Sequence, residues 1–230
     1  KKTYYKYFFA DHYITDMALS DNGMSSCAVG FSAQNGGLVS SAYVFDYDKE
    51  TPKIKVDYPD TMLLEAHYFS NGNIVVIGDN LVSFINVFTG KNINISYSSK
   101  NLAAFSINKS DGLAISLSSS EDCTDCEILV FNRKGKQEGT TIKTDKKITA
   151  ISYKHNKIAA LSYGNAFVYN LTGEILSKKE VGQDAKNIEF FSSNGLYILG
   201  LTEIRKIYFW LFLTFILIIL LNYGMIHTVI

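Results

Sequence analysis

Arginine is almost absent from this chain, and there is no excess of positive charge. Only two of the 22 basic residues are arginine, Arg133 and Arg205, and 22 acidic residues balance them. Nucleic-acid binding depends on clustered lysine and arginine side chains that contact phosphates. The composition therefore excludes nucleic acid as an expected partner.

Proline is also scarce, with two residues in a chain of 230, whereas 47% of the residues are apolar and 13% are aromatic. A chain with so little proline and so much Tyr, Phe, Ile and Val favours strands over disorder. Its length is sufficient for one folded domain with a substantial core.

Cysteine occurs three times, an odd number that gives neither a disulfide framework nor a complete metal-ligand set. Cys123 and Cys126 have the spacing of a metal or redox pair, but a zinc ion needs two further ligands and no second pair exists. We treat them as weak metal candidates and expect ordinary loop cysteines or a local disulfide. Cys27 lies inside a predicted strand, where a core thiol is expected.

One short sequence phrase occurs four times in the chain and indicates an internal repeat. Residues 168–174 (VYNLTGE) are matched closely by residues 130–136, without the glycine by residues 44–50, and with one extra residue by residues 85–91. Each copy is typical of a strand that ends in a tight turn, where Asp or Asn bonds the backbone and Gly supplies a positive φ. The turns are about 40 residues apart, which is the length of one four-stranded propeller blade.

The repeat predicts the fold class. We expect an all-β, β-propeller-like chain with four to five four-stranded blades over residues 1–206, forming part of a larger ring. A β-sandwich would also give short strands, but it would not require one phrase in each 40 residues. The first turn of each unit is marked in order by Gly23, Gly72, Gly112, Asn156 and Gly195, and the unit with the longest spacing carries a polar insertion at Ala33 to Ser40.

The usual catalytic signatures are missing. The chain has no G-x-S-x-G, P-loop or H-E-x-x-H sequence, and its four histidines, His12, His67, His155 and His227, fall in different segments. A quinone-dependent dehydrogenase of this fold would carry repeated tryptophan motifs, whereas the one tryptophan here is Trp210. We therefore expect no cofactor, no catalytic residues, and histidines that are satisfied or at the surface.

The last 24 residues form an uncharged hydrophobic tail. No Asp, Glu, Lys or Arg occurs from Ile207 to Ile230. Residues 207–226 are long enough to cross a bilayer as a C-terminal helix, which would leave residues 227–230 as a short tail. The alternative is a hydrophobic tail produced by a reading-frame error or an unusual gene end, because the uncharged run begins where a propeller would need its last strand.

Four segments resemble a bacterial family described as domain of unknown function 5711. They are Ile14–Gly23, Phe69–Gly72, Ile77–Asn80 and Glu203–Ile207, and the likeness covers roughly residues 14 to 207. The resemblance implies a single-pass protein with an N-terminal membrane anchor and an extracytoplasmic propeller of the quinoprotein-like or WD40-like type. The anchor and the early blades would lie before Lys1. The motifs are structural and imply no catalytic residue, and the hydrophobic tail departs from the family pattern.

These observations predict a non-enzymatic, membrane-anchored interaction module. Propellers bind partners through inter-strand loops, and the longest loops expected here are Ala33 to Ser40 and Ser118 to Cys126. A protein, peptide or envelope glycan would bind there, and the membrane would be a second partner through the tail. The alternative is an extracytoplasmic hydrolase or lyase whose site is assembled from several blades. The interaction-loop residues are Gln34, Asn35, Gly36, Gly37, Glu121, Asp122 and Asp125.

Overall fold

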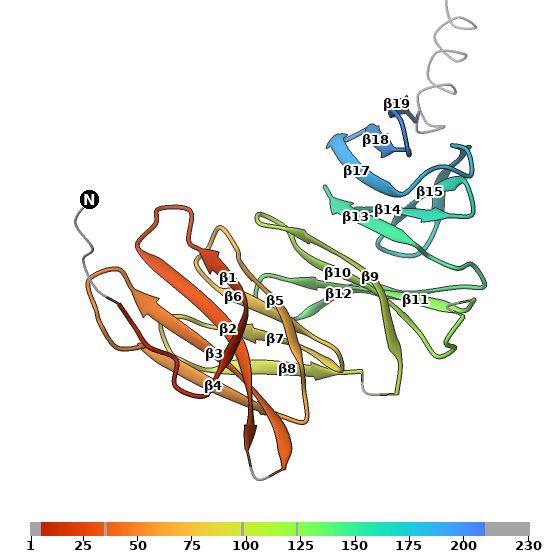
Figure 1. Cartoon of the computed structure of the whole chain (residues 1–230). Coiled ribbons are helices and arrows are strands. Elements are labelled where there is room, and N and C mark those ends of the chain that lie inside the picture. Colours follow the sequence, from red (N-terminus) through yellow and green to blue (C-terminus); the bar gives the residue numbers. More distant parts are fainter. Residues whose placement is uncertain (1–5, 35, 98, 123, 210–230) are drawn as a thin grey trace, which may run out of the picture.

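The computed structural model describes residues 6–34, 36–97, 99–122 and 124–209, and this part of the chain forms 19 strands and no helix. The strands make five antiparallel sheets (Figure 1). Sheet 1 contains β1 (Tyr13–Leu19), β2 (Ser25–Gln34), β3 (Gly37–Asp46) and β4 (Ile54–Pro59), and sheet 2 contains β5 (Leu63–Tyr68), β6 (Ile74–Gly78), β7 (Leu81–Ile85) and β8 (Asn92–Ser96). Sheet 3 contains β9 (Asn101–Asn108), β10 (Gly112–Ser118), β11 (Cys126–Asn132) and β12 (Gln137–Thr144). Sheet 4 contains β13 (Ala150–Lys154), β14 (Lys157–Ser162), β15 (Asn165–Asn170) and β16 (Ile175–Glu180), and sheet 5 contains β17 (Asn187–Ser192), β18 (Gly195–Leu199) and β19 (Ile204–Tyr208).

Each sheet is built from consecutive strands of the chain. The first strand lies at one edge, and every strand pairs with the next one along the sequence. The all-β class and the repeated unit of four strands predicted from the sequence are confirmed, and the fifth unit has three strands within the described residues.

The asparagine in the repeated phrase explains why the chain turns there. The side-chain oxygen of Asn132 accepts the backbone N–H groups of the residues two and four positions later, at 3.0 and 3.2 Å. Asn170 does the same at 3.0 and 2.9 Å, and Asn86 accepts the N–H groups two and three positions later. Such Asx turns satisfy backbone donors that would otherwise lose their strand partners.

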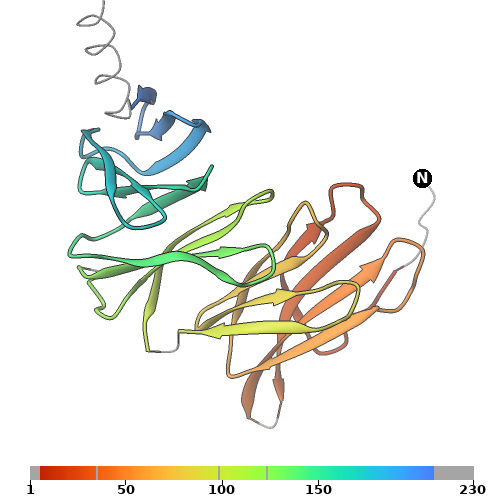
Figure 2. The same ribbon diagram turned by 180° about the vertical axis from the view of Figure 1, so that it is seen from behind.

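Consecutive sheets pack face to face, with a cluster of buried apolar side chains between each pair. Both ribbon views show the sheets following one another along an open arc, with the first strands toward its concave side (Figures 1 and 2). Alternate residues of one strand serve the two neighbouring interfaces. On β15, Phe167 and Tyr169 pack toward sheet 3, whereas Ala166 and Val168 pack toward sheet 5.

The insertion predicted as a loop at Ala33 to Ser40 is instead the end of a long hairpin. Strands β2 and β3 stay paired through Ser32 with Val39 and Gln34 with Gly37. A φ of +79° at Gly36 lets the chain reverse within this short turn. The additional polar residues therefore lengthen two strands, because backbone pairing satisfies their N–H and C=O groups.

The predicted tail helix begins in residues that have another structure. Ile207 and Tyr208 end strand β19, and the Phe209 side chain is buried between sheets 4 and 5. The rest of that prediction, residues 210–226, and the short tail 227–230 lie outside the described residues. Among the residues that are described, no helix is long and apolar enough to cross a membrane.

Candidate binding site at the β10–β11 loop

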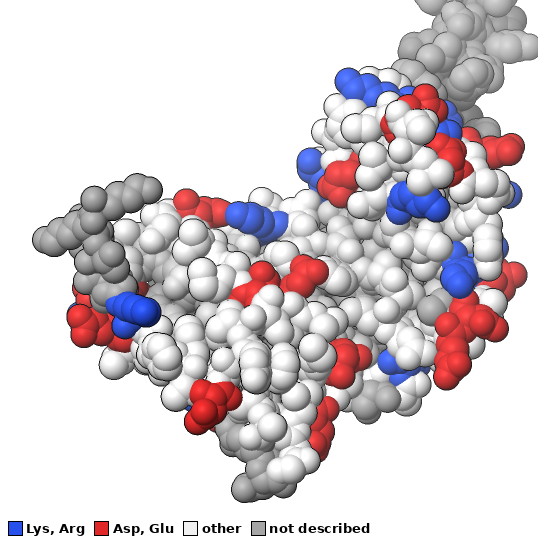
Figure 3. Space-filling view, viewed as in Figure 1, with Lys and Arg blue, Asp and Glu red and all other residues white. Residues whose placement is uncertain are grey.

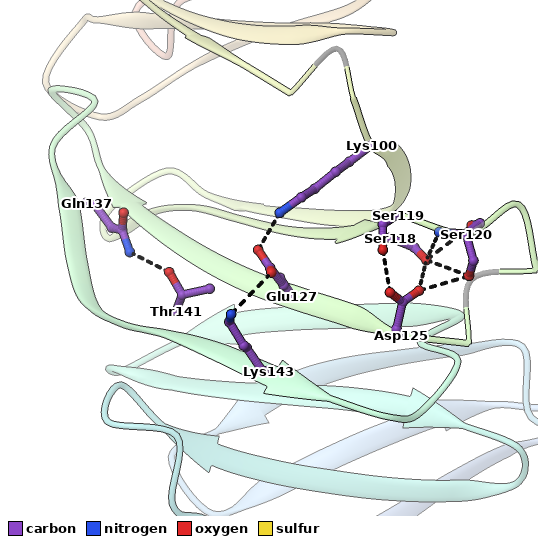
Figure 4. A network of polar contacts seen from close by, with 9 residues as sticks. All are labelled: Lys100, Ser118, Ser119, Ser120, Asp125, Glu127, Gln137, Thr141 and Lys143. Carbon is purple, nitrogen blue, oxygen red and sulfur yellow. Dashed lines mark hydrogen bonds and ion pairs between the residues drawn. The ribbon is translucent and has the colours of Figure 1, made fainter.

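A polar pocket lies at one end of sheet 3, beside the loop that joins β10 to β11. Its cavity measures about 420 Å³. The walls come from the residue before β9, the β10–β11 loop, the start of β11 and the end of β12 (Figure 4). The lining residues are Lys100, Leu117, Ser119, Asp125, Cys126, Glu127, Lys143, Thr144 and Asp145. We call it the loop pocket.

Three consecutive serines hold the Asp125 carboxylate in place. Ser119 Oγ donates to Asp125 Oδ2, and Ser118 Oγ and Ser120 Oγ each donate to Oδ1 at 2.9 Å. Ser120 Oγ also accepts the backbone N–H of Thr124 at 3.2 Å. The loop is thus fixed by its own side chains.

These hydrogen bonds also determine the protonation state of the site. Donated first by Ser119 and then by Ser120 and Ser118, they lower the pKa of Asp125 to about 2, because hydrogen bonds to a carboxylate stabilise its charged form. Asp125 therefore presents a permanent negative charge at neutral pH, and its side chain is exposed to solvent.

A second charged group, formed by two lysines and a glutamate, also lines the pocket. Lys100 Nζ lies 2.6 Å from Glu127 Oε2, and Lys143 Nζ lies 3.8 Å from Glu127 Oε1. Glu127 and Lys143 are direct cross-strand partners on β11 and β12, which places their side chains on one face. The Lys143 side chain is 79% exposed and only loosely paired, so it is available to a ligand.

The two predicted interaction loops do not form one site. Figure 1 shows the tip of the β2–β3 hairpin projecting from sheet 1, away from sheet 3, and that tip contains the predicted residues Gln34, Gly36 and Gly37. Asn35 lies outside the described residues. Of the predicted residues in the second loop, Asp125 lines the pocket, while Glu121 and Asp122 are exposed beside it.

The cysteine pair gives no metal site in the described part of the chain. Cys126 is buried in β11 within the cluster between sheets 3 and 4, and Cys123 lies outside the described residues. No group of three His, Cys, Asp or Glu side chains among the described residues could hold a metal ion. Cys27 is fully buried in the core between sheets 1 and 2, as predicted, and burial raises the pKa of its thiol to about 12.

The described histidines lie away from the loop pocket. His12 Nε2 lies 3.0 Å from Tyr43 Oη, and His67 Nε2 lies 2.9 Å from Glu65 Oε2. His155 is exposed in the β13–β14 turn, and His227 lies outside the described residues. The prediction of satisfied or surface histidines is thus confirmed for the three that are described.

Sequence reasoning missed the lysine–glutamate group. Lys100 precedes β9, Glu127 begins β11 and Lys143 ends β12, so 43 positions of sequence separate residues that the sheet brings together. The available signal was a charged residue at the same end of three of the four strands predicted for this unit.

Comparison with known sequences adds a family but no activity. No curated protein is similar enough to the chain to count as a relative. A family of unknown function, DUF5711, matches residues 6–209 of the 230. The match covers all five sheets and the loop pocket, and the chain belongs to this family.

Proposed function

We propose that the chain is a non-catalytic binding module, a segment of a β-propeller ring that takes a partner protein, peptide or envelope glycan in the loop pocket. The observation that carries this proposal is the rigid, charged wall formed by Asp125 and its three serines beside a cavity of about 420 Å³. A cavity of this size with a few fixed polar groups is typical of a recognition site.

The charge states of the pocket favour binding over proton transfer. A general base works best with a pKa near the operating pH, and the serine hydrogen bonds hold the pKa of Asp125 at about 2. Glu127 is engaged by Lys100 at 2.6 Å. These carboxylates can orient a donor group on a ligand but are poorly suited to accept its proton. The hydrolase or lyase alternative stays a prediction without a residue to carry it.

The exposed ends of the arc support a larger ring. In sheet 4, Phe167 and Tyr169 are buried against sheet 3. The equivalent residues of sheet 1, Tyr43 and Phe45, face away from sheet 2, and Phe9 packs on Tyr43 with ring centroids 5.1 Å apart. An extended segment thus stands where a preceding sheet stands elsewhere. Repeat units bury both faces on their neighbours, so a preceding sheet fits this position.

The far face of sheet 5 carries partly exposed apolar side chains. It presents the aromatic group of Phe191, Tyr197 and Tyr208, and beside them Leu199 is 46% exposed and Ile204 66% exposed. Earlier sheets bury this face on the next sheet. Lys109 of sheet 3 and Asp21 of sheet 1 form an ion pair, which brings the first turns together around a common centre, as a ring requires.

A site-specific crosslinking experiment tests the loop pocket. A photoreactive amino acid placed at Ser119 should capture a partner in cells, and the same residue at Thr172, in an exposed turn of sheet 4, provides the matched control. Lys143→Glu should remove the Ser119 adduct, since it replaces the available cation by an anion. Equal adducts from both positions, or an adduct that survives Lys143→Glu, would show that the pocket is not the binding site.

We also propose that the ring is membrane-anchored and extracytoplasmic. The uncharged run from Ile207 to Ile230 and the likeness to anchored propellers support this placement. A Thr172→Cys variant in a Cys123→Ser background supplies one exposed thiol, because Cys27 and Cys126 are buried. A membrane-impermeant maleimide should label it in intact cells. Labelling only after lysis would place the sheets in the cytoplasm.

A further inference from the structure

A second polar cavity lies at the opposite end of sheet 3, where turns from three sheets meet. It measures about 340 Å³. Its walls come from the β5–β6, β9–β10, β11–β12 and β13–β14 turns, with one residue each from β11, β12 and β13. The lining residues are Asn71, Ser110, Asp111, Asn132, Arg133, Lys134, Glu138, Tyr153 and Asn156. We call it the turn pocket.

Hydrogen bonds between the sheets hold these turns together. Arg133 Nη1 donates to Ser70 Oγ at 3.0 Å, and Asn73 Nδ2 donates to the Arg133 carbonyl at 3.0 Å. The backbone N–H of His155 donates to Asp111 Oδ2 at 3.0 Å. The pocket is therefore preformed, and a ligand would not have to order its walls.

One buried hydroxyl in this pocket has no partner. The Tyr153 side chain is 2% exposed and lines the cavity, and its Oη makes no hydrogen bond within the described part of the chain. Buried hydroxyls in folded proteins are nearly always paired. The other buried tyrosines of the described residues follow that rule, with partners found for Tyr43, Tyr58, Tyr68, Tyr97 and Tyr169.

The repeat shows why this tyrosine differs. Tyr68 pairs with Ile74 at the start of β6, as Tyr153 pairs with Ile158 near the start of β14. Tyr68 Oη lies 2.8 Å from the Oγ of Ser25, the first residue of β2 in the preceding sheet.

The equivalent first residue in sheet 3 is a glycine. Ser25 pairs with Asp46, and at the same point of the repeated phrase Gly112 pairs with Asn132. Since Gly112 has no hydroxyl, the partner that Tyr68 has is missing for Tyr153. The sequence thus leaves a buried hydroxyl without a protein partner on a residue that lines the turn pocket, while keeping the fold.

The charges around this hydroxyl define the ligand. The pocket has two cations, Arg133 and Lys134, and two carboxylates, Asp111 and Glu138, so its formal charge is zero. The Glu138 side chain is half-buried and has no hydrogen bond or ion pair among the described residues. Glu138 and Asp111 lie close enough to act electrostatically on the Tyr153 hydroxyl. A ligand must therefore accept a hydrogen bond from the phenol and donate one to a carboxylate.

We propose that the turn pocket binds a neutral saccharide, with Tyr153 donating to a sugar hydroxyl that itself donates to Glu138 or Asp111. A hydroxyl group serves both roles with one oxygen, whereas an ammonium only donates and a carboxylate only accepts. The amide nitrogens of Asn71 and Asn132 supply further donors, and the amide group of Asn156 supplies a donor and an acceptor. The cavity accommodates one or two sugar rings. This site is independent of the loop pocket, which lies at the other ends of the same strands.

The test uses ligand-observed NMR with maltose, cellobiose, lactose and diacetylchitobiose as probes. The full chain is kept in lauryldimethylamine oxide, a detergent without a sugar headgroup. At least one disaccharide should give a saturation-transfer signal, and Tyr153→Phe should weaken its binding about tenfold, the effect of losing one hydrogen bond. Tyr58→Phe, which removes a hydroxyl bonded to Ser83 in the core, is the matched control and should leave binding unchanged.

Four results would overturn the proposal. The first is the absence of a signal from all four sugars, and the second is equal binding by the Tyr153→Phe and Tyr58→Phe variants. The third is a lower melting temperature for Tyr153→Phe than for the parent chain without sugar, since that would show that a bound water already satisfies the hydroxyl. Stronger binding of a zwitterionic amino acid, such as alanine, would equally contradict the neutral ligand.

Discussion

Alanine at two glycines of the first turns should have very different effects on stability. Gly23 and Gly112 mark the first turns of sheets 1 and 3 and have φ values of +69° and +149°. A Cβ added at Gly23 would meet nothing within 4 Å, so Gly23→Ala carries only the strain of a left-handed backbone, about 1–2 kcal/mol. A Cβ at Gly112 would lie 2.0 Å from the carbonyl oxygen of Phe131, far inside a normal C···O contact of about 3.3 Å.

The clash at Gly112 has no inexpensive relief, because the blocking atom is backbone of the paired strand β11. Moving it would break the pair between Gly112 and Asn132 and disturb the core between sheets 2 and 3, which contains Phe131. We expect Gly112→Ala to cost more than about 4 kcal/mol, a large part of the roughly 5–15 kcal/mol that holds a domain folded.

Urea unfolding, followed by circular dichroism, measures both costs. The midpoint should fall modestly for Gly23→Ala and steeply for Gly112→Ala, with similar slopes if the unfolded states are alike. Asn156→Gly is a useful control, since Asn156 occupies the equivalent turn at a φ of +58° and asparagine tolerates that conformation. Costs for the two alanine variants that agree within about 1 kcal/mol would refute the steric reasoning.

Three further predictions concern the loop, the last sheet and the buried thiol. The pKa of Asp125 is lowered to about 2, so its charge contributes to loop stability above its ordinary pKa of about 3.9, and this contribution is lost as the pH falls through 2. The loss of loop stability over that interval should appear as faster amide exchange in the loop, and Asp125→Asn should abolish this pH dependence. Arg205 Nη2 donates to both oxygens of Asp184 at 2.7 and 2.8 Å, while Nη1 donates to the Val181 carbonyl. A lysine has one nitrogen and cannot reach both partners in this geometry, so Arg205→Lys should speed proteolysis between β16 and β17, and an unchanged rate would mean that these bonds do not hold that connection. Cys27 should react with thiol reagents only as fast as the protein unfolds, and labelling well below the urea midpoint would contradict its burial.

The repeat phrase predicted the sheets well because its turns are local. Asn132 and Asn170 bond backbone N–H groups within four residues, so the sequence contains both partners of each interaction. The prediction of a loop at residues 33–40 was wrong for the opposite reason. The serines and glycines of this segment have the composition of a loop. They are strand residues because β2 and β3 pair with each other there, as in the pair of Ser32 with Val39.

The binding sites were less predictable than the fold. Asp125 was expected in an interaction loop and lines the loop pocket, but its lysine and glutamate neighbours come from other strand ends. The turn pocket was not predicted at all. Tyr153 has the pattern of an ordinary core aromatic, and its missing partner depends on Gly112, 41 positions earlier in the chain.

Both pockets lie where the strands end, and the repeat explains this location. Within the sheets, alternate apolar positions face the two neighbouring interfaces, and close packing there restricts each position to similar side chains in every unit. Turn and strand-end residues lack that restriction. Acidic and basic side chains are interspersed over the face of the molecule that Figure 3 shows. A single difference there, such as Gly112 in place of the serine found in sheet 1, leaves the core intact and gives one unit an unsatisfied polar group. Comparing equivalent positions between units is therefore a more direct route to the binding residues of such a chain than searching for catalytic motifs.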